Sequence, residues 1–233
     1  MTMSDQGYAP AQYRLGRMYL VGDGVSKDRA EEAKWCRQAA VQGDFSAQDD
    51  LGWMYAHGEG VPKDAAEAER WYRKAADQGY DSARAHLGFL YADGDGVPKN
   101  STEAARWLRK AANQGNADAQ CKLGIMYSNG DSVSKDSAEA AKWYRAAADQ
   151  GHTVGQHNLS VRYWNGDGVP KDAIEGLAWM NVAAASGDED SIQSRNTMEN
   201  FLGRDATLAA QQRSKELMKE IETVKREPIS PAP

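Results

Sequence analysis

The sequence predicts an all-α solenoid in which one helix-turn-helix repeat of 36 residues is used five times. Three observations predict it: a glycine that recurs every 36 residues, a tryptophan with the same period, and a leucine and a tyrosine that keep this interval. The recurring residues are Gly7, Gly43, Gly79, Gly115, Gly151 and Gly187; Trp35, Trp71, Trp107, Trp143 and Trp179; Leu15, Leu51, Leu87, Leu123 and Leu159; and Tyr19, Tyr55, Tyr91, Tyr127 and Tyr163. Such a period is typical of stacked repeats, because a single repeat cannot bury its own apolar face.

The first half of each repeat is predicted to be a helix, and residues 44–79 show this best. Leu51 and Tyr55 are four residues apart and therefore share one helical face. Gly58 follows at the point where a left-handed residue commonly ends a helix. The loop 58–63 also contains a proline, which cannot continue the helix.

The second half of each repeat is predicted to be another helix. Asp64 stands at its N-cap, and Glu67, three residues later, completes a capping box. The equivalent pairs are Asp28/Glu31, Asn100/Glu103, Asp136/Glu139 and Asp172/Glu175. Trp71 and Ala75 then form an apolar face, so we expect small residues to bring the helices close together while the indole fills the space between them.

Composition excludes several classes of protein. Leu, Ile, Val and Phe together number 31 of 233 residues, but 37 alanines, 10 tyrosines and 7 tryptophans supply the remaining core. A net charge of −6 is too small to keep the chain expanded, and 34 acidic residues against 28 basic ones argue against a nucleic-acid binder. The sequence contains neither an apolar run long enough to span a membrane nor a visible secretory signal.

The repeated pattern resembles the Sel-one-like repeat, a branch of the tetratricopeptide-like helical repeats. The third repeat carries the match through Ala83, Leu87, Gly88, Tyr91, Gly94, Gly96, Val97, Trp107, Ala111, Ala112 and Gly115. The resemblance implies a right-handed α/α superhelix, a role as an adaptor for protein complexes, and no shared catalytic site. Ser160 replaces the first-helix glycine in the fifth repeat, which puts close helix packing there in question.

The domain organisation follows from the period. We expect repeats at about 8–43, 44–79, 80–115, 116–151 and 152–187, together spanning 8–187. Residues 188–226 are predicted to form degenerate C-terminal capping helices, and residues 227–233 a disordered tail. The tripeptide Asp5-Gln6-Gly7 is identical to the tripeptides that end the second helix of other repeats. We therefore hypothesise that the chain is a fragment of a longer array or lacks a processed N-terminal segment.

Recognition of a partner should use the positions that vary between repeats. In tetratricopeptide-like pairs the first helix lines the concave surface, and Trp53, Phe89, Ile125 and Val161 would form a row along it. The candidate partner-binding residues are Arg17, Asp49, Trp53, His57, Phe89, Asp93, Ile125, Asn129, His157, Val161 and Trp164. An apolar row with a polar rim suits an extended peptide or a partner helix. Alternatively, the same row packs the first helices against one another.

The sequence predicts neither a catalytic residue nor a cofactor. The loop Gly166-Asp167-Gly168 lacks the alternating ligands of a calcium loop, and the four histidines have no zinc spacing. Cys36 and Cys121 suggest buried free thiols rather than a nucleophile.

We therefore expect a non-catalytic, monomeric scaffold that binds a protein or peptide in its concave groove, with no nucleic acid and no membrane span. The alternatives are a hydrolase acting on cell-wall or β-lactam substrates and a structural spacer or oligomerisation module. The hydrolase is disfavoured, because the sequence shows no Ser-x-x-Lys motif with a supporting box. The compartment stays open: cytoplasmic or, if an N-terminal segment was removed, periplasmic or secreted.

Overall fold

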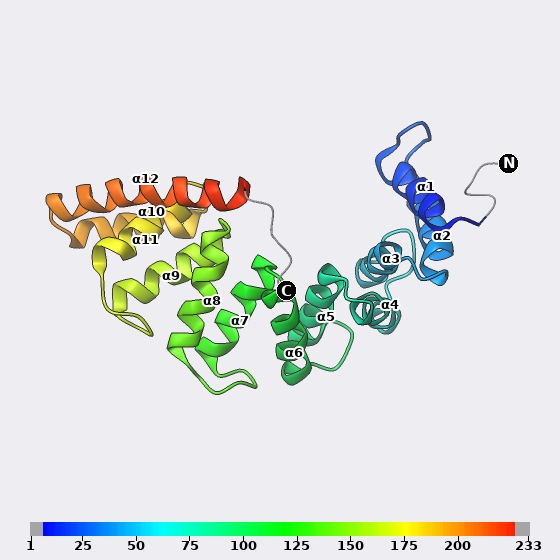
Figure 1. The fold of residues 1–233 in the computed structure, drawn as a ribbon, viewed down its shortest axis with the longest axis horizontal. Helices are drawn as coiled ribbons and strands as arrows, with labels where there is room; N and C mark the ends of the chain where they lie inside the picture. Colours follow the sequence, from blue (N-terminus) through cyan, green and yellow to red (C-terminus); the bar gives the residue numbers. More distant parts are fainter. Residues whose placement is uncertain (1–6, 227–233) are drawn as a thin grey trace. The chain divides into compact units, whose positions relative to one another are not determined.

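The structure, a computed structural model, describes residues 7–226, and these form successive pairs of antiparallel helices (Figure 1). The helices are α1 (Ala9–Val21), α2 (Arg29–Val41), α3 (Phe45–His57), α4 (Ala65–Asp77), α5 (Asp81–Asp93), α6 (Ser101–Asn113), α7 (Ala117–Asn129), α8 (Ser137–Asp149), α9 (Thr153–Asn165), α10 (Ala173–Ala184), α11 (Glu189–Phe201) and α12 (Arg204–Arg226). Residues 7–226 contain no strand, so the predicted all-α solenoid is confirmed. The predicted tail at 227–233 and the text before Gly7 lie outside the described residues.

Two compact units divide the chain, at 1–110 and 111–233, and each is described by itself. In both units α1, α3, α7 and α9 each pack against the second helix of their own repeat. Second helices also contact the first helix of the following repeat, as α2 does with α3 and α8 with α9. Each apolar stripe is therefore covered by its neighbours along the chain.

The first helix of the second repeat ends, and its second helix begins, at the residues that the sequence predicts. Gly58 has φ 75°, and its N–H donates to the carbonyl oxygen of Met54. The Asp64 carboxylate accepts hydrogen bonds from the N–H groups of Ala66 and Glu67. Every described second helix with a resolved cap, α2, α4, α8 and α10, begins in this way.

The predicted capping box forms only in its first half. The Asp64 N–H donates to the Tyr55 carbonyl oxygen at 2.9 Å and so does not need the glutamate. Glu67 instead accepts a hydrogen bond of 3.0 Å from Nε1 of Trp71, one turn later. Its carboxylate therefore orients the buried indole rather than the cap.

Close packing within a repeat depends on a glycine in the first helix. A Cβ on Gly52 would lie 2.6 Å from Cδ1 of Tyr72, and a Cβ on Gly124 would lie 2.6 Å from Cδ1 of Tyr144. In the fifth repeat Ser160 takes this place, and its Oγ donates to the Gly176 carbonyl oxygen at 2.6 Å. A glycine on the opposing helix, Gly176, thus restores the close approach that the sequence had put in question.

Glutamine side chains connect successive repeats, which the sequence analysis did not anticipate. Gln48 Nε2 donates to the Ala40 carbonyl oxygen of the preceding repeat at 3.0 Å, and Gln78 Nε2 donates to Gln48 Oε1 at 2.7 Å. Gln120 makes the equivalent bonds in the second unit. The signal was present in the 36-residue phase of Gln42, Gln78, Gln114 and Gln150 and in that of Gln12, Gln48, Gln120 and Gln156, where Arg84 replaces glutamine in the third repeat.

On α2, α4 and α8, an arginine reaches the periodic tyrosine of the next repeat. Arg73 donates to the Tyr91 hydroxyl, which in turn donates to Glu69 Oε1 at 2.6 Å, and Arg73 also contacts Glu69 at 2.9 Å. Burial alone would raise the pKa of Glu69, but the hydrogen bonds from Tyr91 and Arg73 hold it below its ordinary value. This carboxylate is therefore more stable ionised in the folded chain than in the unfolded one.

We expect Glu69→Gln to lower the free energy of unfolding at pH 7 by about 1 kcal/mol. A depressed pKa contributes stability above the unfolded value, near pH 4, and that stability is lost as the pH falls through the folded value. The difference between wild type and variant should therefore shrink in denaturant titrations carried from pH 7 to about pH 3. The exposed Glu189→Gln serves as control, and a Glu69→Gln difference that is constant over this pH range contradicts the assignment.

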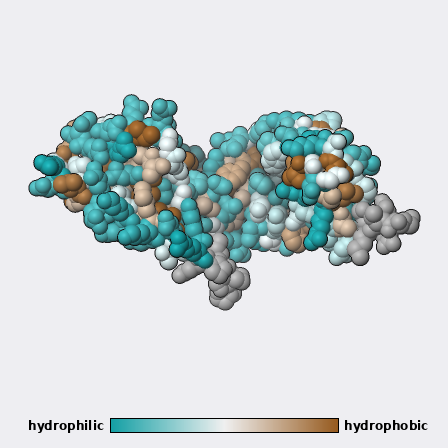
Figure 2. Space-filling view, turned by 90° about the horizontal axis from the view of Figure 1, so that it is seen from above, coloured by the Kyte–Doolittle hydropathy of each residue, from teal (hydrophilic) through white to brown (hydrophobic). Residues whose placement is uncertain are grey.

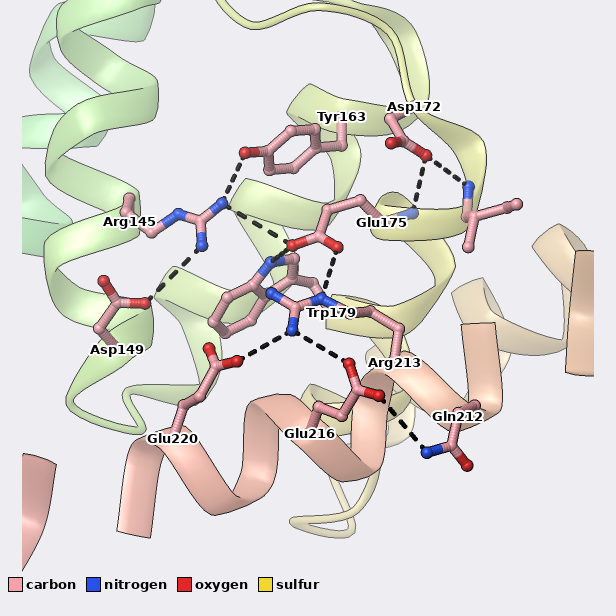
Figure 3. Close-up of polar contacts among 11 residues, drawn as sticks. Arg145, Asp149, Tyr163, Asp172, Glu175, Trp179, Gln212, Arg213, Glu216 and Glu220 are labelled. Carbon is pink, nitrogen blue, oxygen red and sulfur yellow. Dashed lines mark hydrogen bonds and ion pairs between the residues drawn. The ribbon is translucent and has the colours of Figure 1, made fainter. Parts of the chain in front are cut away.

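The second unit ends in a long helix, α12, that packs along α10. Leu217 and Ile221 of α12 enter the core formed by residues such as Leu177 and Met180. Figure 3 shows Arg213 of α12 among carboxylates: its guanidinium contacts Glu175 at 3.0 Å and also Glu216 and Glu220. Helices α11 and α12 thus follow the fifth repeat in the region where the sequence predicts capping helices.

Candidate partner-binding groove

Two adjoining pockets open on the first compact unit, and we call them together the unit 1 groove. The first, of about 410 Å³, is lined by Arg17, Leu20, Arg29, Glu32, Asp49, Asp50, Trp53, Met54 and His86. The second, of about 300 Å³, is lined by Trp53, Ala56, His57, Tyr72, His86, Phe89, Leu90, Asp93 and Asp95. Trp53 and His86 line both pockets. On the face drawn in Figure 2, hydrophilic residues predominate and hydrophobic residues gather in small patches.

Aromatic rings from three helices form the walls of the second pocket. The Trp53 and His57 rings are stacked at 4.3 Å between centroids, and His57 Nδ1 lies 2.9 Å from the Trp53 carbonyl oxygen. Tyr72 and His86 form a second ring pair at 5.1 Å. These contacts fix the orientation of the rings before any ligand binds.

Hydrogen bonds and ion pairs join the polar side chains on the floor of the first pocket. Asp49 is only 5% exposed and lies 2.8 Å from Nδ1 of His86, which comes from the next repeat. Asp50 accepts a hydrogen bond from the Tyr13 hydroxyl at 2.9 Å and lies 3.5 Å from Arg17. Polar groups of neighbouring repeats thus meet at the base of the groove.

At two carboxylates of this floor, hydrogen bonds and ion pairs offset only part of the cost of burying the negative charge. Glu32 is 2% exposed and contacts Arg29 at 2.8 Å, yet burial raises its pKa above the ordinary value. Burial also raises the pKa of Asp50, although Tyr13 and Arg17 act in the opposite direction. A raised pKa means that the negative charge is less stable here than in water, so additional positive charge would stabilise both groups.

Six of the predicted site residues come together in this groove: Arg17, Asp49, Trp53, His57, Phe89 and Asp93. The prediction missed His86, Glu32 and Tyr72. His86 precedes Phe89 by three residues, and residues at that spacing share a helical face, so its position could have been found. Glu32 and Tyr72 belong to second helices, and the period alone does not show which of their side chains reach the groove.

The other predicted site residues belong to the second compact unit. His157 and Trp164 line a pocket of about 680 Å³ formed with residues of α11. Ile125 and Val161 pack against the hydrophobic core of this unit. Asn129 is exposed near the end of α7, where its amide lies 3.4 Å from Asp131.

The two cysteines are free and buried, as expected. Burial raises the pKa of the Cys121 thiol to about 11 and that of Cys36 further. Because the thiolate is the reactive form, both residues are poor nucleophiles at neutral pH. Within residues 7–226, no three His, Cys, Asp or Glu side chains gather as a metal site would require. None of the helices in that range combines the length and hydrophobicity needed to cross a bilayer.

The 36-residue pattern matches the family model described as Sel1 repeat at residues 9–44, 45–80, 81–116, 117–152 and 153–188. The chain belongs to the Sel1 repeat family. Sel1 repeat proteins are generally scaffolds for protein interactions and are typically not enzymes. A search of curated proteins finds no match to the chain.

Solved structures of Sel1 repeat proteins are similar over almost the whole chain. A protective antigen of uropathogenic Escherichia coli, c5321, is 36% identical with a TM-score of 0.83, covering 95% of this chain and 47% of that one. The chain thus spans about half the length of that antigen. A Sel1 repeat protein from Oxalobacter formigenes is 33% identical with a TM-score of 0.79, covering 96% of this chain and 91% of that one. A Klebsiella pneumoniae protein at 19% identity and a TM-score of 0.53 shares the fold, over 85% of this chain and 97% of that one.

Proposed function

We propose that the chain is a non-catalytic scaffold that holds an extended peptide segment of a protein partner in the unit 1 groove. This proposal depends on one observation: the periodic residues of the first helices are buried, whereas variable residues next to them line the groove. The periodic Leu51 and Leu87 are fully buried, whereas Trp53 and Phe89, two positions later, stay half-buried and line the groove. The residues that vary between repeats therefore meet solvent where a partner can reach them.

The shape and chemistry of the groove suit a peptide. Its two pockets share Trp53 and His86 in their linings, so each can take one side chain of an extended chain. Rings such as Phe89 offer apolar contact, and rim groups such as Asp93 and Arg17 can bind peptide amides and carbonyls. Rigid aromatic walls also reduce the entropy that binding costs.

Catalysis is not favoured by the side chains of the groove. Glu32, Asp50 and Asp49 are each held by a hydrogen bond or an ion pair with Arg29, Tyr13 or His86. A nucleophile next to a base is not found among the lining residues. The groove residues are thus arranged for recognition.

We expect the double variant Trp53→Ala/Phe89→Ala to keep its helical fold and to lose peptide binding at least about tenfold. Peptides would be selected from a display library on the immobilised full chain, and their affinities measured by fluorescence anisotropy. Phe45→Ala is the matched control, because Phe45 is an aromatic residue of the same unit, 47% exposed, that does not line the groove.

Circular dichroism and denaturant unfolding of the double variant decide between binding and packing. A folded variant that has lost the selected peptides supports the proposal. Loss of cooperative unfolding shows instead that the two rings pack the first helices together. Unchanged affinity places the binding surface elsewhere and contradicts the proposal.

A further inference from the structure

We propose that the second pocket of the unit 1 groove binds a cationic side chain, a lysine ammonium or an arginine guanidinium, of the peptide. This inference rests on the proposed function and specifies the chemistry of the partner. It depends on two properties of the pocket, its aromatic walls and its charge.

Five ring side chains from α3, α4 and α5 surround the pocket of about 300 Å³: Trp53, His57, Tyr72, His86 and Phe89. The face of an aromatic ring carries partial negative charge and attracts a cation within about 6 Å of its centre, most strongly for tryptophan. Trp53 and His57 are stacked, and Tyr72 and His86 contact each other, so the rings are held in position from two sides.

The acidic residues at the rim also favour a positively charged ligand. Asp93 and Asp95 line the pocket, and its lining contains neither lysine nor arginine. Lys63 reaches Asp95 from outside at 2.9 Å, with both side chains more than half exposed, so this pair is weak and open to water. The rim of the pocket therefore accepts positive charge.

The adjoining pocket adds to this preference. Its lining contains three carboxylates, Glu32, Asp49 and Asp50, against the two guanidinium groups of Arg17 and Arg29. Asp49 lies directly behind His86, which lines both pockets. An anionic side chain would meet ring faces and aspartates and would be repelled. A purely apolar side chain would gain no electrostatic attraction from the aspartates.

The experiment compares one cation with its neutral isostere. N-acetyl-lysine methylamide and N-acetyl-norleucine methylamide are titrated into the full chain, and the Trp53 indole N–H is followed by NMR, assigned with Trp53→Phe. We expect the lysine compound to bind at least about fivefold more tightly than the norleucine compound. Asp93→Asn should reduce this ratio, whereas Asp190→Asn, in the pocket of the second unit, should leave it unchanged.

Equal dissociation constants for the two compounds, or no shift of Trp53 with either, overturn the inference. The proposed function is judged separately by the selected peptides. Peptides that depend on Trp53 and Phe89 but lose no affinity when Lys or Arg is replaced by norleucine or citrulline refute the cation site alone. Failure of every selected peptide to depend on the groove refutes the proposed function.

Discussion

Trp179→Ala is expected to lower the free energy of unfolding by about 3–5 kcal/mol, because truncation of a buried tryptophan removes its contacts and leaves a cavity. Trp179 is 1% exposed, and its Nε1 donates to Glu175 at 3.0 Å. The guanidinium of Arg145 covers the ring face at 5.0 Å from its centre (Figure 3). Chemical denaturation measured by circular dichroism gives the change directly.

Trp164→Ala is the matched control in the same unit. Trp164 is half-buried at the edge of a pocket, so its replacement should cost clearly less than that of Trp179. Similar losses for the two variants would contradict the assignment of the buried periodic indoles, Trp71, Trp107 and Trp179, as packing centres of their repeats.

Gly168→Ala is expected to cost about 2–5 kcal/mol, from a left-handed backbone and a steric clash. Gly168 has φ 80°, and a Cβ there would lie 2.0 Å from the carbonyl oxygen of Ser137, the first residue of α8. Neither backbone can move away easily, because this oxygen belongs to the first turn of a helix. Gly60 meets the Arg29 carbonyl oxygen in the same way at 2.0 Å.

Gly24→Ala separates the backbone contribution from the clash. Gly24 occupies the same place in the first repeat with φ 69°, but a Cβ there would only touch Cε of Met18 at 3.7 Å. Its replacement should cost about 1–2 kcal/mol. Ser132 already adopts φ 56° at the equivalent position, which shows that the conformation alone is tolerated. Equal costs for Gly24→Ala and Gly168→Ala in thermal and denaturant unfolding would exclude the loop contact.

Helices could be predicted from the sequence where capping aspartates and left-handed glycines mark their ends. Asp64 and Gly58 determine a start and a stop without reference to distant residues. The use of Glu67 could not be predicted, because it depends on where the Trp71 indole lies after the helices have packed. Local signals thus located the elements, and packing decided which polar groups meet.

The groove could be predicted only in part. The 36-residue phase identified Trp53 and Phe89 as variable positions on first helices. The phase predicted that Asp49 lies on the exposed face of its helix, whereas His86 from the next repeat covers the Asp49 carboxylate. It also treated Val161 like Trp53, yet Val161 packs on the core of the second unit. Packing across neighbouring repeats decides whether a half-buried side chain faces its neighbour or the solvent, and a repeat period contains no such information.

The Arg213 contacts have a consequence for the dynamics of the second unit. α10 is in contact with α9, α11 and α12, and Arg213 joins α12 to Glu175 near the start of α10. We expect detachment of α12, which breaks both the ion pairs and the Leu217 contacts, to be one step that slows exchange of the α10 amide protons with solvent. We therefore expect α12 to protect α10, and the amide protons of α10 to exchange most slowly in this unit.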